Sequence, residues 1–130
     1  MVTCSQAMTY SHKSKLFVRS RQFAVDVFRL VDTLPKTVSG RTIADQLARS
    51  ASSQAANYRE ARRARSAREF ISKMGISLQE IEESKFWLEM VTELFSASSD
   101  KVGGLQSEAD ELAAMFAASL RTAKNNSAGR

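Results

Sequence analysis

Apolar residues recur at three- and four-residue spacing along four stretches of the chain, a pattern typical of helices that bury one face. The first stretch covers residues 13–34 and stops before Pro35, which has no amide hydrogen to continue a helix. Its apolar side chains form one wide stripe: Leu16, Phe17, Phe23, Ala24, Val27, Phe28, Leu30, Val31 and Leu34. The pattern predicts a helix over 13–34 and a connection at 35–40.

The second predicted helix begins near Gly40 or Arg41 and extends to about Arg65. An apolar face and an arginine-rich face lie on its opposite sides. The inward positions are Ile43, Leu47, Ala51, Gln54, Tyr58 and Ala61. Arg65 would fall on the apolar face if the helix continued, and the S-x-x-E sequence that starts at Ser66 fits a capping box. We therefore predict a break at residues 64–66, with Ser66 capping the third helix.

The third predicted helix is the longest, from about Ala67 to Phe95, and the fourth runs from about Leu105 to Ala123. Residues 96–104 are rich in serine and glycine and are interpreted as the loop between these helices.

The polar stretches 1–12 and 124–130 have no apolar periodicity and are expected to be disordered tails. Four amphipathic helices joined by short connections predict an all-α fold. The expected architecture is an antiparallel up-down-up-down four-helix bundle over residues 13–123.

The composition removes most enzyme classes. A chain of 130 residues is about one domain, and its single cysteine, Cys4, and single histidine, His12, exclude a disulfide framework and a Cys- or His-based metal site. No dinucleotide, phosphate-loop, zinc-protease or nucleophile-elbow motif occurs. We expect no enzyme activity, no cofactor and no small-molecule substrate.

With no apolar leader and no run of about 18 apolar residues, we expect a cytoplasmic protein that does not enter membranes.

The net charge of +5 is divided unevenly along the chain. Residues 1–73 hold 14 Lys or Arg against 5 Asp or Glu, whereas residues 74–130 hold 5 against 9. The two halves therefore carry formal charges of +9 and −4. Such halves are typical of solvated helix faces, but they can also meet each other in neighbouring copies or meet a phosphate backbone.

The strongest local feature is a run of five arginines within ten residues, where the second predicted helix gives way to the third. These candidate nucleic-acid-binding residues are Arg59, Arg62, Arg63, Arg65 and Arg68. Planar guanidinium groups match phosphate oxygens, which favours a polyanion partner. Arginines near a helix C-terminus also complement the helix dipole, a purely structural role.

Two polar groupings have a structural and a functional interpretation. The clustered acids Glu80, Glu82 and Glu83 are interpreted as a solvated face or as ion-pair partners of an arginine, rather than as a metal site. The second grouping is a stripe on the second predicted helix: Ser50, Ser53, Asn57 and Glu60. We interpret this stripe as a hydrogen-bond ladder to a neighbouring helix, with a ligand site as the alternative.

The apolar stripes are wider than one central seam requires, and surplus apolar flanks often indicate self-association. The candidate subunit-interface residues are Phe17, Phe28, Phe86, Trp87 and Met90.

Short motifs over residues 20–95 occur in a recognisable order: LPK, QL-x-RSA, AN-x-x-E, S-x-x-EF and WL. With them the chain resembles the 23S rRNA-intervening-sequence (S23) protein family. The resemblance implies a four-helix bundle, commonly a ring of five subunits, without family catalytic residues. The accessory variability proteins of diversity-generating retroelements are similar in fold, and they are basic pentamers that bind nucleic acid and reverse transcriptase. Many members have glycine where this chain has Ala61.

Two functional hypotheses follow. The first is a non-enzymatic scaffold that assembles as a homo-oligomer, expected to be a pentamer. The second is an accessory protein that binds RNA or DNA without sequence preference through the five arginines.

Overall fold

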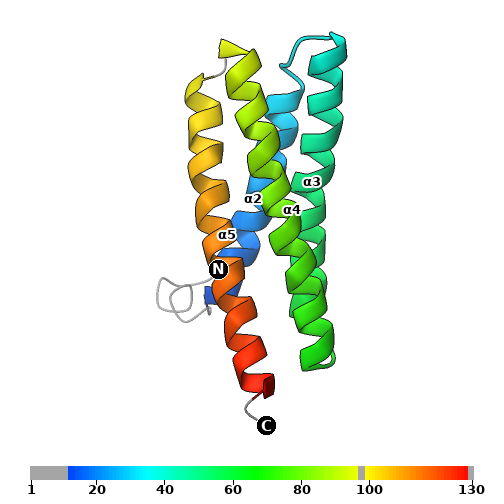
Figure 1. Ribbon diagram of the computed structural model, residues 1–130, viewed down its shortest axis with the longest axis vertical. Helices are drawn as coiled ribbons and strands as arrows, with labels where there is room; N and C mark the ends of the chain where they lie inside the picture. Colours follow the sequence, from blue (N-terminus) through cyan, green and yellow to red (C-terminus); the bar gives the residue numbers. More distant parts are fainter. Residues whose placement is uncertain (1–11, 97–98, 129–130) are drawn as a thin grey trace, which may run out of the picture.

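Four helices lie side by side in this protein (Figure 1). The computed structural model describes residues 12–96 and 99–128. The helices are α2, His12–Val31; α3, Val38–Arg62; α4, Ala67–Leu94; and α5, Ser99–Ala128. Successive helices run in opposite directions, which confirms the predicted all-α, antiparallel up-down-up-down bundle.

The helices are arranged in the order in which they follow one another. Each packs against its neighbours in the chain, and α5 packs back against α2. The backbones of the diagonal pairs, α2 with α4 and α3 with α5, lie farther apart, although the Tyr58 ring of α3 still contacts Phe116 of α5 in the core. The α3–α4 seam is the most extensive contact, and the α2–α5 seam on the opposite side of the bundle is the least extensive.

The boundary between α3 and α4 lies where the sequence predicted it. Helix α3 ends at Arg62, and Ser66 is the N-cap of α4. The Ser66 hydroxyl accepts a hydrogen bond from the Glu69 amide at 3.1 Å, as a capping box requires. The Glu69 carboxylate in turn accepts from the amide of Arg65 at 3.4 Å, one residue before the cap.

Helix α3 begins at Val38, slightly before the predicted start near Gly40 or Arg41. Thr37 is its N-cap, and the Thr37 hydroxyl accepts from the amide of Gly40 at 3.1 Å. A side chain at Gly40 would overlap the carbonyl oxygen of Pro35. The turn before α3 therefore requires a glycine at this position.

Helix α2 ends at Val31, three residues before the predicted end at Leu34. The amides of Thr33 and Leu34 bond to carbonyl groups three residues back, at 2.9 and 3.2 Å. These bonds tighten the chain into a turn, which still buries Leu34 against the core.

The predicted loop at 96–104 was wrong over most of its length, because α5 begins at Ser99 rather than at Leu105. Val102 and Leu105 are both buried. Their burial favours the helix by more than the roughly 2 kcal/mol that the two glycines at 103–104 cost relative to alanine.

Helix α5 also extends beyond its predicted end at Ala123, as far as Ala128. Residues 124–128, predicted to belong to a disordered tail, are therefore helical in this structure. Of the predicted N-terminal tail, residues 1–11 lie outside the described residues.

All four helices contribute to one hydrophobic core. Its largest fully buried apolar side chains include Phe23, Leu47, Met74, Ile81, Leu88, Leu112 and Phe116. Tyr58, predicted to face inward, stacks on Phe116 with ring centroids 5.4 Å apart, and burial raises the pKa of its hydroxyl. None of the described helices is both long enough and apolar enough to span a bilayer.

Candidate interaction surfaces

The α3–α4 seam is closed by small polar side chains in the middle of the bundle. The hydroxyls of Ser50 and Ser84 are 2.8 Å apart, and the Ser77 hydroxyl donates to the backbone carbonyl of Gln54 at 3.0 Å. The Gln54 amide nitrogen donates to the carbonyl of Ser20 on α2 at 2.8 Å. All five residues are fully buried, and within the described chain the Gln54 Oε1 is a buried acceptor without a partner.

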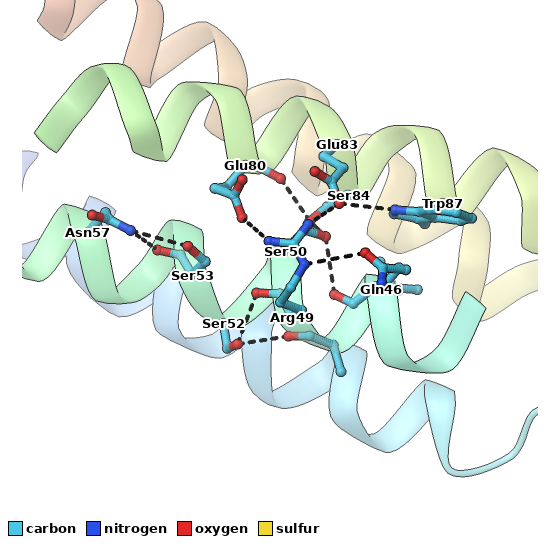
Figure 2. Close-up of polar contacts among 12 residues, drawn as sticks. Gln46, Arg49, Ser50, Ser52, Ser53, Asn57, Glu80, Glu83, Ser84 and Trp87 are labelled. Carbon is cyan, nitrogen blue, oxygen red and sulfur yellow. Dashed lines mark hydrogen bonds and ion pairs between the residues drawn. The ribbon is translucent and has the colours of Figure 1, made fainter. Parts of the chain in front are cut away.

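An arginine-centred cluster covers the outer side of the same seam (Figure 2). Arg49 of α3 donates to Glu80 at 2.8 Å, to Glu83, and to Gln46 at 3.3 Å. The Trp87 indole also donates to Glu83, at 3.2 Å. The hydrogen bond to Glu83 raises the pKa of the Arg49 guanidinium. For Glu80 and Glu83, the interpretation as ion-pair partners of an arginine is confirmed.

The predicted polar stripe of α3 reaches α4 at only part of its length. Ser50 bonds to α4 as described above, and Glu60 pairs with Lys73 of α4 at 2.7 Å. This pairing lowers the pKa of Glu60 and raises that of Lys73. Asn57 instead donates to the Ser53 carbonyl in its own helix at 2.9 Å. The ladder prediction is correct for Ser50 and Glu60 and wrong for the other two residues.

The α2–α5 seam is held mainly by ionic contacts at its surface. Arg19 of α2 donates to Glu108 at 2.6 Å and to Glu111 at 3.0 Å on α5. The hydrogen bond to Glu108 is the largest cause of the raised pKa of Arg19.

Next to this ion pair the seam opens into a groove of about 480 Å³, which we call the α2–α5 groove. Buried Phe23, Leu30 and Leu105 form its apolar part, and its charged lining residues are Asp26, Arg29, Lys101 and Glu108. The sequence pattern did not indicate this groove.

The five arginines predicted to bind nucleic acid are all exposed at the turn between α3 and α4. Arg62 lies over the ring of Phe17, with its guanidinium carbon 4.5 Å from the ring centroid. The other four side chains form no hydrogen bond or ion pair with any described residue. Arg19, Arg49 and Lys73, in contrast, are all paired with carboxylates across a seam.

The five predicted interface residues lie on α2 and α4, at diagonal corners of the bundle. Phe28 on α2 and Phe86 on α4 are 47% and 49% exposed. Phe17, Trp87 and Met90 are partly buried and pack against the core. Phe86 meets the Trp87 ring edge-on, with centroids 4.9 Å apart.

Further large apolar side chains are exposed. They are Val18, Val38, Ile76 and Leu94. Val18 lies on α2, and Leu94 is the last residue of α4. Val38 and Ile76 were missed, because Val38 fell in a predicted connection and Ile76 lies outside the periodic stripe of its helix.

Within the part of the chain that the structure describes, no group of three or more His, Cys, Asp or Glu side chains is arranged to hold a metal ion.

Comparison with known families matches residues 12–118 to the family described as 23S rRNA-intervening sequence protein. The chain belongs to this family of helical-bundle proteins. Among solved structures it is similar to a protein with unknown function from the S23 ribosomal protein family of Bacteroides thetaiotaomicron. The two share 26% identity with a TM-score of 0.75, over 84% of this chain and 97% of that chain. No curated protein matches the chain.

Proposed function

We propose that this protein is a non-enzymatic, cytoplasmic scaffold that assembles with further copies of itself. The observation that carries the proposal is the exposure of Phe28 and Phe86 on α2 and α4, two helices at diagonal corners of the bundle. Large aromatic side chains exposed beside other apolar ones are typical of protein interfaces. No cofactor and no catalytic residue form part of the proposal.

Two different surfaces on one chain favour a ring over a simple pair. When one surface of a copy binds a different surface of the next, the contacts close into a ring if the rotation permits. The family resemblance adds an expected number of five subunits.

The first experiment measures the mass of the protein in solution by light scattering. We expect a multiple of the 14.4 kDa chain, with five copies as the specific expectation. Replacing Phe28 or Phe86 with serine should lower the mass without loss of helix content, because both side chains are half exposed. Val38→Ser is the matched control, since Val38 is 75% exposed but lies at the end of α3. A single-chain mass for the unmodified protein contradicts the scaffold proposal.

A second candidate function is sequence-independent binding of RNA or DNA at the α3–α4 turn. It is favoured by the contrast between the four arginines there, which have no partner among the described residues, and the paired cations of the seams. Exposed guanidinium groups that form no ion pair with a carboxylate remain available to bind phosphate oxygens. In a ring, each subunit would add one such cluster, and several weak contacts would act together.

Binding of RNA and duplex DNA, measured by fluorescence anisotropy, tests this second function. Affinity should fall steeply between about 50 and 200 mM salt, because phosphate contacts release counterions. Replacing Arg59, Arg62 and Arg63 together with alanine should abolish binding. The matched control removes three exposed positive charges outside the arginine cluster and the α2–α5 groove: Arg21→Ala, Lys36→Ala and Arg41→Ala. Equal loss in both triple variants, or no loss in the first, contradicts the assignment to the arginine cluster.

A further inference from the structure

The α2–α5 groove contains a glycine whose position no contact within the chain explains. Gly104 lines the groove in the second turn of α5, and a Cβ added there would meet nothing within 4 Å. A glycine within a helix costs about 1 kcal/mol relative to alanine. A glycine in an open position allows another chain to approach the backbone closely. With buried Phe23, Leu30 and Leu105 beside it, the groove offers an apolar cavity that is open to a partner.

On α4, Phe86 has the shape and surroundings of a group that fills such a cavity. Its ring is 49% exposed and is supported from one side by Trp87. The residues at spacings of −4, +3 and +7 are Glu82, Glu89 and Glu93, so one helix face presents an aromatic ring among exposed carboxylates. Glu89 and Glu93 form no hydrogen bond or ion pair with any described residue.

Two acids and two bases line the groove, but Glu108 is paired with Arg19, so the charge that remains beside the groove is positive and complementary to this face. Lys101 at the groove is exposed and has no ion pair among the described residues, and Arg29 is paired only loosely with Asp26, at 3.7 Å. Opposite charges around an apolar anchor orient two chains and exclude wrong pairings. Two copies of the α4 face could not pair with each other symmetrically without placing glutamates against glutamates.

The geometry points to a head-to-tail contact in which Phe86 of one copy enters the α2–α5 groove of the next. Glu89 and Glu93 then lie near Lys101 and Arg29 of that neighbour. This inference rests on the proposed self-association and identifies the two surfaces that meet. Because the donor face and the groove are different surfaces of one chain, the same contact repeats from copy to copy and closes a ring.

Crosslinking of two single-cysteine variants tests which surfaces meet. In a Cys4→Ser background, Glu89→Cys and Lys101→Cys are prepared separately, mixed under conditions that allow exchange, and treated with a short bis-maleimide. We expect a crosslinked dimer in the mixture and no crosslink in either variant alone. A crosslink in Glu89→Cys alone indicates symmetric pairing of α4 faces and overturns the inference. An uncrosslinked mixture of wild-type-like mass also overturns it, while leaving self-association intact.

Filling the groove provides a second, independent test. Gly104→Trp should lower the mass to that of a single chain while helix content is retained, because the new Cβ would meet no neighbouring part of the described chain within 4 Å beyond its own stretch of helix. The matched control is Gly103→Trp, an equally open position on the same helix that does not line the groove. We expect this control to keep the wild-type mass. Docking in the groove is overturned if both variants dissociate equally or if neither dissociates. A single-chain mass for the unmodified protein instead contradicts the proposed self-association itself.

Discussion

The α3–α4 seam and the α2–α5 seam lie on opposite sides of one bundle and differ in what fills the space between their helices. In the first, buried serines allow the two helices to approach closely and bond to each other. In the second, one ion-paired arginine lies next to an open groove. The same four-helix architecture therefore contains one seam completed by its own side chains and one that leaves an open, partly apolar groove.

The largest effect is expected from enlarging a side chain in the closed seam. Ser84→Leu should lower the free energy of unfolding by about 2–4 kcal/mol, because it overpacks a filled space and removes the partner of the Ser50 hydroxyl on α4. Chemical denaturation measures the loss. The matched control is Ser107→Leu on the exposed side of α5, where we expect a change within about 0.5 kcal/mol. Similar losses at the two positions would show that the α3–α4 seam is not closely packed.

A smaller loss of stability is expected when the arginine of each seam's ion pairs is removed, and the loss should differ between the two seams. Arg49→Ala should destabilise by about 1 kcal/mol, since it leaves the Glu80 carboxylate, with 11% of its side chain exposed, without an arginine. Arg19→Ala should cost roughly half as much, because the Glu108 side chain is 29% exposed and better solvated. Denaturation midpoints of both variants provide the comparison, with Arg21→Ala as the control, since Arg21 is exposed and has no ion pair with any described residue. A larger loss of stability in Arg19→Ala than in Arg49→Ala would mean that the Arg19 ion pairs stabilise the α2–α5 seam more than their exposure indicates.

Replacing a glycine of α5 with alanine should stabilise the protein slightly. Gly103→Ala is expected to raise the free energy of unfolding by about 0.5–1 kcal/mol, because the position is helical and has open space around it. Gly40→Ala is the control with the opposite sign, since its Cβ would overlap the Pro35 carbonyl. Thermal melts at equal protein concentration decide between the two signs. Destabilisation by Gly103→Ala would indicate a contact at α5 that the isolated chain lacks.

The smallest expected effect is a shift in the pKa of Glu60, which pairs with Lys73 at the exposed end of the α3–α4 seam. Lys73 lowers the pKa of Glu60 below its ordinary value of 4.5, so this pair adds stability above that pH and loses it as the pH falls through the lowered pKa. Lys73→Met should return the Glu60 pKa towards its ordinary value. Carboxyl carbon titration by NMR measures the shift, with Lys85→Met as a control for general charge removal. An unchanged Glu60 pKa in Lys73→Met would exclude the pair in solution.

Periodicity and capping signals were sufficient to predict the fold and its sharpest boundary. Arg65 conflicted with the apolar face of a longer helix, and Ser66 could accept from an amide three residues on, so two independent signals marked one break. At the start of α5 the local signal was misleading. Serine and glycine are typical of loops, but burial of Val102 and Leu105, which is a tertiary effect, favours the helix.

The surfaces were predictable only where a residue type is informative by itself. Five arginines close together indicate an exposed cationic cluster in almost any helical fold, and they are exposed here. The buried hydrogen bonds of Ser77 and Ser84 could not be predicted, because serine has no strong preference for core or surface and its partner lies on another helix. The groove depends on how closely α2 approaches α5, and sequence periodicity contains no information about that distance.

The unequal seams also have a consequence for the order of folding. Helices α3 and α4 are consecutive in the chain and share the most extensive contact, so their hairpin forms with a short loop closure. The α2–α5 contact joins helices from opposite ends of the sequence and has less packing to offset that loop closure. We therefore expect α3 and α4 to associate early and the chain ends to dock late. Amide hydrogens of α2 and α5 should exchange with solvent through partial opening, while those of α3 and α4 exchange only when the whole bundle unfolds.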